Sequence, residues 1–152
     1  MKKLLLIVTF AVFTMAVFAQ TGIWGLAFNQ SVEDARNVMK SNGFKLMEEK
    51  GTMITYTNAS IRYLDKVTLY LALSGKNLES WTIYYKGVKD HAAQASILNE
   101  LDKLHGDIRY FDREYGGWVW ELENDMAIYA TTLSEGEFIV RYTEYIYDDY
   151  EW

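Results

Sequence analysis

The chain has 152 residues with 21 acidic and 15 basic side chains, a formal net charge of −6, and neither cysteine nor proline. The lack of cysteine excludes disulfides and thiol chemistry. The acidic excess argues against nucleic acid and anionic membranes as partners, because their phosphates require a lysine- and arginine-rich surface. Twelve Tyr, seven Phe and five Trp, with no proline, favour a body rich in antiparallel strands.

The first nineteen residues have the pattern of an export signal. Two lysines precede an apolar run from Leu4 to Val17, and Ala19 completes the small-residue pattern of a cleavage site. The run is shorter than the ~20 residues of a spanning helix, which makes an uncleaved anchor the less favoured alternative. We therefore expect a signal peptide over residues 1–19, and a periplasmic or secreted single domain over 20–152 that meets the membrane only through the transient signal.

The first half of this domain is predicted to be one helix followed by four strands. Ser31 and Asp34 form a capping pattern, and Asn42-Gly43 supplies a stop, which predicts a helix over about residues 32–41. The apolar period then changes from 3.6 to 2, and one such alternation extends to Leu73. Strands are expected at about residues 44–49, 52–57, 67–73 and 81–85, with 61–64 left unassigned.

The same pattern then starts again. Asp90 predicts the cap of a second helix, and Gly106 predicts its end. Four further strands are expected at about residues 108–114, 117–123, 126–132 and 137–147, before an acidic, aromatic tail that ends at Trp152. The chain thus predicts an α+β fold of two tandem helix-plus-four-strand repeats, at about 24–87 and 88–147. Together they would form a mostly antiparallel sheet with the helices on one face.

The stretch WGLAFNQSVEDA, from Trp24 to Ala35, resembles the opening of repeats in the β-lactamase-inhibitor-protein-like families, which include small outer-membrane-assembly lipoproteins. In those families a glycine and a methionine usually precede the helix, whereas Asn29-Gln30 stands here. The predicted tandem order is similar to that of the inhibitor, although the inhibitor's disulfides have no counterpart. The resemblance implies an exported binding protein that uses the open face of its sheet, and it assigns no individual contact residue.

Residues suited to catalysis or metal binding are sparse. His91 and His105 lie at opposite ends of the second predicted helix, about 21 Å apart at ~1.5 Å per residue, so they cannot share a site. The helix dipole favours a protonated His105 at the C-terminal end, which is a structural reason for that residue. Asn124-Asp125 and Asp148-Asp149-Glu151 lack the spacing of a calcium loop, and a solvated turn and tail are the favoured interpretation. We expect no catalytic histidine, no cofactor and no metal.

One pair of carboxylates has a spacing that suits glycoside chemistry. Glu121 and Glu123 share a face of one predicted strand, about 6.6 Å apart at ~3.3 Å per residue. Any two residues at i and i+2 on a strand have this spacing, so a solvent-facing strand is the favoured interpretation. A secreted hydrolase that uses these surface carboxylates remains an alternative.

The tyrosines indicate a binding surface more specifically than the carboxylates indicate a catalytic site. Tyr70, Tyr84 and Tyr129 alternate with aliphatic residues, which places them with Glu121 and Glu123 on the helix-free face, while Trp118, Trp120 and Leu122 should face the helices. Tyrosine and acid on an open sheet have the composition of recognition sites. This predicts an exported, non-catalytic protein that recognises a protein or peptide, such as an inhibitor or envelope-assembly factor. Ordinary cross-strand packing, or a structural homodimeric envelope protein, remains open as an alternative.

Overall fold

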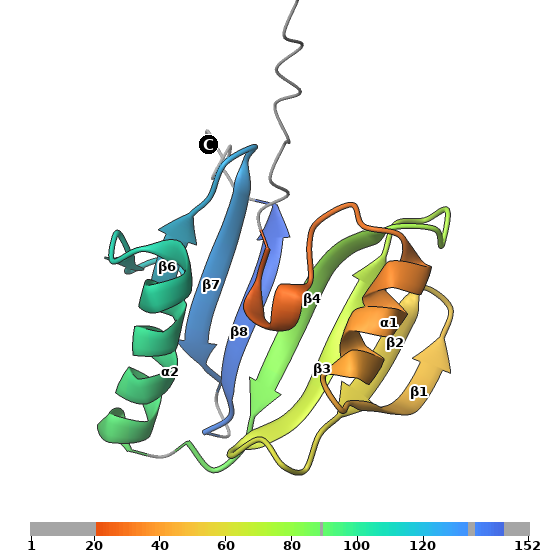
Figure 1. Ribbon diagram of the computed structural model, residues 1–152. Coiled ribbons are helices and arrows are strands. Elements are labelled where there is room, and N and C mark those ends of the chain that lie inside the picture. The colour runs from red at the N-terminus through yellow and green to blue at the C-terminus, as the bar shows by residue number, and fades with distance from the viewer. Residues whose placement is uncertain (1–20, 89, 134–135, 145–152) are drawn as a thin grey trace, which may run out of the picture.

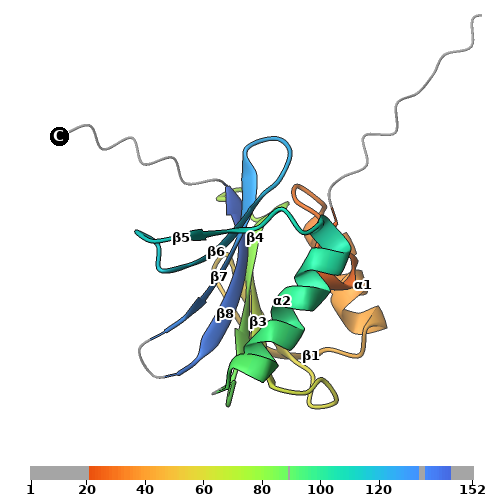
Figure 2. The ribbon, with the colours of Figure 1, turned by 90° about the vertical axis from the view of Figure 1, so that its left-hand side faces the viewer.

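The computed structural model describes residues 21–88, 90–133 and 136–144. Within these ranges the chain is an α+β fold in which two long helices pack on one eight-stranded antiparallel sheet (Figure 1). Figure 2 shows both helices on the same side of the sheet, as predicted. The expected signal peptide, residues 1–19, and the acidic tail up to Trp152 lie outside the described residues.

The elements follow one another in an order that matches the predicted helix-and-four-strands pattern. They are the short 3-10 turn η1 (Ile23–Gly25), α1 (Val32–Ser41), β1 (Lys45–Lys50), β2 (Met53–Thr57), β3 (Leu64–Leu71), β4 (Leu78–Tyr85), α2 (His91–His105), β5 (Tyr110–Asp112), β6 (Gly117–Glu121), β7 (Met126–Thr132) and β8 (Phe138–Glu144). The sheet order is β1-β2-β3-β4-β8-β7-β6-β5. Each half of the sheet therefore comes from one half of the chain, and β4 and β8 join the halves at the centre.

Both helices begin and end where local chemistry predicts. The Ser31 hydroxyl accepts a hydrogen bond from the Asp34 amide at 3.1 Å, and an Asp90 carboxylate oxygen accepts one from the Ala93 amide at 2.6 Å. These contacts satisfy amides that the first helical turn leaves unpaired. Gly106 directly follows α2 with a φ of +92°, a conformation that side chains with a Cβ rarely adopt.

Three of the predicted strands end two residues earlier than the sequence indicates. Leu73 was expected on the third strand, but β3 ends at Leu71, and Leu73 is 100% exposed in the turn that follows. A hydrogen bond from the Ala72 amide to the Asn77 carbonyl closes that turn at 2.9 Å. The predicted strand 117–123 ends at Glu121, and the predicted strand 108–114 is reduced to β5. In each case a turn closes earlier than the apolar alternation stops.

The core lies between the helices and the sheet, and Trp81, Trp120 and Tyr142 are fully buried in it. Trp118, Trp120 and Leu122 contribute to this cluster, which confirms the side predicted for them. Residues 21–30 lie over β4 and β8 between the two helices (Figure 1). There Gly22 meets the indole of Trp81 so closely that a Cβ would lie 2.4 Å from Cζ2.

Candidate functional site

The helix-free face of the sheet, to which Thr68, Thr82, Tyr70 and Tyr84 belong, is covered by its own side chains. The Tyr70 and Tyr84 hydroxyls lie 3.4 Å apart, and the Lys66 ammonium lies 4.7 Å from the centre of the Tyr84 ring. Thr82 is 0% exposed, although no helix covers this face. Burial, together with the neighbouring Tyr70, raises the pKa of Tyr84 to about 12. Tyr70 and Tyr84 thus lie where the sequence placed them, as a half-buried pair.

Tyr129 lies on the same face but is not accessible, which corrects the expectation that it is exposed. It is 4% exposed, and the Tyr115 ring packs edge-on against it with 4.8 Å between ring centres. With Val119 and Ala127 it forms a second, smaller apolar cluster. Tyr115 reaches this position because Gly116 and Gly117 let the connection between β5 and β6 turn tightly over β7, where the Thr131 hydroxyl donates to the Gly116 carbonyl at 2.9 Å.

The two candidate carboxylates do not share a strand. Glu121, the last residue of β6, lies opposite Ala127 and accepts a hydrogen bond from the Tyr110 hydroxyl at 3.0 Å. Glu123 lies beyond β6, in the connection to β7, where Asn124 and Asp125 have φ values of +58° and +57°. The strand spacing that suggested a carboxylate pair is therefore wrong, because the strand ends two residues earlier than the pattern indicated.

The described residues contain neither a group of side chains suited to a metal ion nor a helix suited to span a membrane. Within the described ranges, no three or more histidine, aspartate or glutamate side chains come together in a group that could hold a metal ion. Asn124-Asp125 lies in a tight turn, and Asp148-Asp149-Glu151 lies outside the described residues. None of the described helices combines the length and apolar character needed to cross a membrane.

His105, the last residue of α2, is half-buried and neutral. Its Nε2 lies 3.0 Å from the Tyr142 hydroxyl, which also accepts a hydrogen bond from the Ile23 amide at 3.3 Å. Burial lowers the pKa of His105 to about 4, and burial raises the pKa of Tyr142, so the contact is a hydrogen bond between a neutral imidazole and a neutral phenol. The expectation of a protonated histidine at the helix C-terminus is wrong, because desolvation outweighs the helix dipole here.

We expect acid to destabilise the fold through this histidine. The folded chain holds His105 neutral down to about pH 4, whereas the unfolded chain takes up the proton near its ordinary pKa of ~6.5, so stability falls between those values as the pH is lowered. Urea unfolding at pH 7 and pH 5 should show a loss of about 1 kcal/mol that His105→Gln lacks, a figure reduced for the ring's partial contact with solvent. His91→Gln is the control and should keep the full loss; an equal loss in His105→Gln would refute the assignment.

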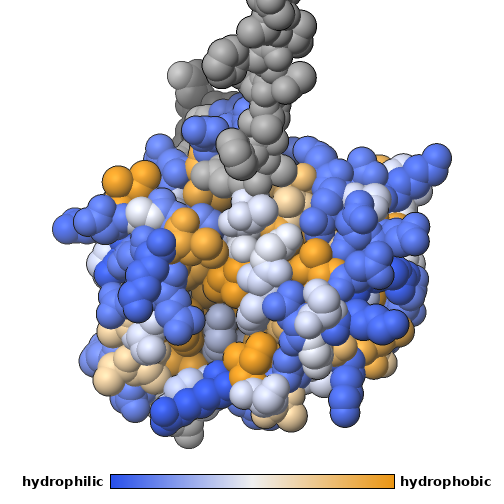
Figure 3. Space-filling view, in the orientation of Figure 1, coloured by the Kyte–Doolittle hydropathy of each residue, from blue (hydrophilic) through white to orange (hydrophobic). Residues whose placement is uncertain are grey.

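A hollow of about 570 Å³ opens on the helix side of the molecule, between α2, η1 and the connection from β2 to β3. Figure 3 shows apolar side chains in the depression between hydrophilic outer surfaces. The space exists because α2 presents small residues there, where a larger side chain would close it. The lining consists of Ile23, Trp24, Ile61, Arg62, Tyr63, Tyr85, Asp90, Ala92, Ala93, Ser96, Ile97 and Glu100. We call this the helix-side hollow.

Two aromatic residues of the helix-side hollow have a left-handed backbone. Trp24 has a φ of +65° and Tyr63 a φ of +66°, a region that bulky residues rarely occupy. Their carbonyls are held in place: the Asn42 side-chain amide donates to Trp24 at 3.2 Å, and the Lys86 amide donates to Tyr63 at 2.7 Å. Strained backbone of this kind clusters at functional sites, and here two separate loops hold such residues against one hollow.

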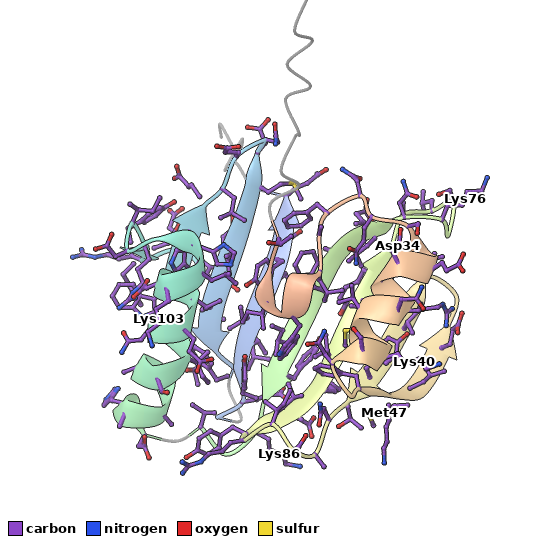
Figure 4. The ribbon with its side chains drawn as sticks, viewed as in Figure 1. Asp34, Lys40, Met47, Lys76, Lys86 and Lys103 are labelled. Carbon is purple, nitrogen blue, oxygen red and sulfur yellow. The ribbon has the colours of Figure 1, made fainter. Side chains whose placement is uncertain are left out.

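The hollow is lined by polar as well as apolar side chains. Tyr85 is 6% exposed, and no hydrogen bond joins its hydroxyl to another described residue. Burial, and then the negative charge of Glu100, raise the pKa of this phenol, so the hydroxyl stays protonated. The Arg62 guanidinium lies 4.6 Å from the centre of the Tyr63 ring. Lys103 and Lys40 lie on the outer sides of the two helices (Figure 4), and neither contributes to the lining.

Sequence reasoning did not select any residue of the helix-side hollow as a site. The available signals were indirect: the unassigned segment 61–64 and the glycines around Trp24. No protein family model matches the chain. No curated protein matches it, and no solved structure matches it.

Proposed function

We propose that the protein is an exported, non-catalytic binding protein whose ligand occupies the helix-side hollow. The observation that carries this proposal is that two loops distant in sequence hold Trp24 and Tyr63 in a strained backbone against the same space. The volume of about 570 Å³ lies within the range of ~300–1,000 Å³ typical of ligand pockets. Export remains part of the proposal because it depends on the pattern of residues 1–19.

The helix-free face is the second candidate for the binding surface. The Tyr70–Tyr84 pair favours it, since a half-buried pair of phenols beside Lys66 gives rigid contact area with polar tips. Glu121 adds an exposed carboxylate to that face. We rank this face below the hollow because neighbouring side chains already cover Thr82 and Tyr129. A partner would therefore meet a less concave surface here than at the hollow.

A matched pair of tryptophan substitutions on α2 tests the choice. Ala92 lines the hollow and Ala95 does not, yet both are exposed residues of the same helix. Ala92→Trp should fill the hollow and abolish capture of the partner from envelope extracts, with little change in the urea midpoint. Ala95→Trp should capture as the wild type does. The captured protein is identified by mass spectrometry, and its binding is then measured again with purified components.

The same measurement includes the double variant Tyr70→Ser/Tyr84→Ser. If this variant loses capture and Ala92→Trp captures normally, the helix-free face is the binding surface and the hollow is not. Equal loss in Ala92→Trp and Ala95→Trp would show that neither substitution acts through the hollow. If all variants capture as well as the wild type, both candidate surfaces are wrong.

A further inference from the structure

The chemistry of the helix-side hollow indicates which ligand it takes, an inference that depends on the proposed function. Its lining combines aliphatic side chains with aromatic rings from three segments: Trp24, Tyr63 and Tyr85. Two carboxylates, Asp90 and Glu100, stand on the α2 side of the same space. Aromatic faces beside carboxylates attract organic cations, because the ring quadrupole and the negative charge act in the same direction.

The local charges favour a cation over an anion. Arg62 is the one basic residue of the lining, and its guanidinium already lies against the Tyr63 ring, 4.6 Å from the ring centre. Glu100, by contrast, is exposed, and no described residue forms an ion pair with it. The net charge of the chain is −6 and becomes more negative if the two lysines of the signal are removed, so long-range attraction also favours a basic partner.

The Tyr85 hydroxyl is the second, independent pointer to a ligand. The Tyr85 side chain is 6% exposed and lines the hollow, and no hydrogen bond joins its hydroxyl to another described residue. This hydroxyl is not among the described polar atoms that are sealed from solvent without a partner, so a ligand in the hollow can reach it and pair with it. The Tyr85 phenol oxygen and the Glu100 carboxylate line the same hollow, and both can accept from the N–H groups of one cation.

We propose that the helix-side hollow binds an arginine or lysine side chain of a basic peptide segment. The cation would lie between Glu100 and the Tyr85 hydroxyl, and its aliphatic stem would pack against Trp24 and Ile97. A peptide fits better than a free small cation because the hollow of about 570 Å³ exceeds what one side chain fills, which leaves room for flanking residues. Arg62, which also lines the hollow, can donate a hydrogen bond to a backbone carbonyl of that peptide.

The test uses pools of N-acetylated, C-amidated hexapeptides measured by fluorescence polarisation. One position is fixed as Arg, Lys, citrulline or Glu, and the others are drawn from Ala, Leu, Phe and Ser. Arg- and Lys-fixed pools should bind the mature protein at least tenfold more tightly than citrulline- and Glu-fixed pools. Raising the salt concentration should weaken this binding severalfold, because the groups are partly exposed.

Two matched substitutions separate the site from the general acidity of the chain. Glu100→Gln should weaken binding of the Arg-fixed pool about tenfold, whereas Glu33→Gln removes the same charge from the exposed side of α1 and should leave it within twofold. Tyr85→Phe, which removes one hydroxyl and keeps the ring, should weaken it severalfold. Equal effects of Glu100→Gln and Glu33→Gln would overturn the proposal, since they would mean non-specific attraction.

The remaining outcomes also decide the question. Binding of the Glu-fixed pool would show that Arg62 selects an acidic ligand, which overturns the proposal. If no pool binds while Ala92→Trp still abolishes partner capture, the hollow is a binding site but the cationic ligand class is wrong. If no pool binds and Ala92→Trp captures normally, the proposed function fails as well.

Discussion

Replacing Trp81 with alanine is expected to lower the free energy of unfolding by ~3–5 kcal/mol, the cost of deleting a core aromatic side chain. Trp81 is 0% exposed at the centre of the sheet on β4. Its ring stacks on Tyr142 with 4.5 Å between centres and packs against Phe28 at 4.7 Å. Because the indole nitrogen has no hydrogen-bond partner among the described residues, the loss is one of packing alone. Urea unfolding followed by far-UV circular dichroism measures it.

Trp118→Ala is the matched control for this experiment. Trp118 contributes to the same core cluster, but it is only partly buried, and its ring lies against Phe111 and the Arg109 guanidinium near the edge of the sheet. We expect roughly half the loss, about 2 kcal/mol, since less area leaves water on folding. A larger loss for Trp118→Ala than for Trp81→Ala would place the energetic centre of the core at β6 and contradict the packing described here.

Tyr129→Ser should destabilise the fold by ~2–4 kcal/mol, although sequence reasoning placed this tyrosine on an exposed surface. The ring is 4% exposed beneath Tyr115, so its removal leaves a void next to Val119 and Ala127. Tyr84→Ser removes a half-buried ring from the same face and should cost about 1 kcal/mol, the ordinary value for a partly exposed site. Thermal and urea unfolding of the two single variants measure the difference.

Tyr115→Ser provides the second arm of this prediction. If the Tyr115 ring is what buries Tyr129, Tyr115→Ser should lower the free energy of unfolding by about half as much as Tyr129→Ser does. The double variant should then lose less than the sum of the two single losses. Strict additivity, or equal losses for Tyr84→Ser and Tyr129→Ser, would show that Tyr129 is not held under Tyr115.

The helices could be predicted closely because their signals are local. Ser31 and Asp90 cap helices whose first turns need acceptors, and Gly43 and Gly106 supply the positive φ that follows each helix. Strand faces could also be predicted, because Trp118 and Trp120 have to alternate with Val119 on any pleated strand. Strand ends were less predictable, since Leu73 continues the alternation of β3 while the chain has already entered a turn.

The candidate sites show where such reasoning stops. Tyr70, Tyr84 and Tyr129 all lie on the helix-free face, as the period of 2 requires, but their exposure depends on which side chain lies above each of them. Tyr115 covers Tyr129 from another strand connection, and no pattern within β7 records that contact. Likewise, Glu121 and Glu123 have strand spacing in the sequence, but the backbone turns between them.

The sequence by itself determined the class of fold, the two helices with their ends, the alternation of the strands and the side of the sheet on which each tryptophan lies. These follow from interactions between residues a few positions apart, so they can be read along the chain. The tertiary structure alone decided the order of the strands, the burial of Tyr129, the partial burial of His105, and the helix-side hollow. The hollow combines Trp24, Tyr63 and Glu100 from three distant segments, and its volume depends on how closely α2 packs against two loops. Packing of this kind is a property of surfaces brought together by folding, and a residue's immediate neighbours in the chain do not specify it.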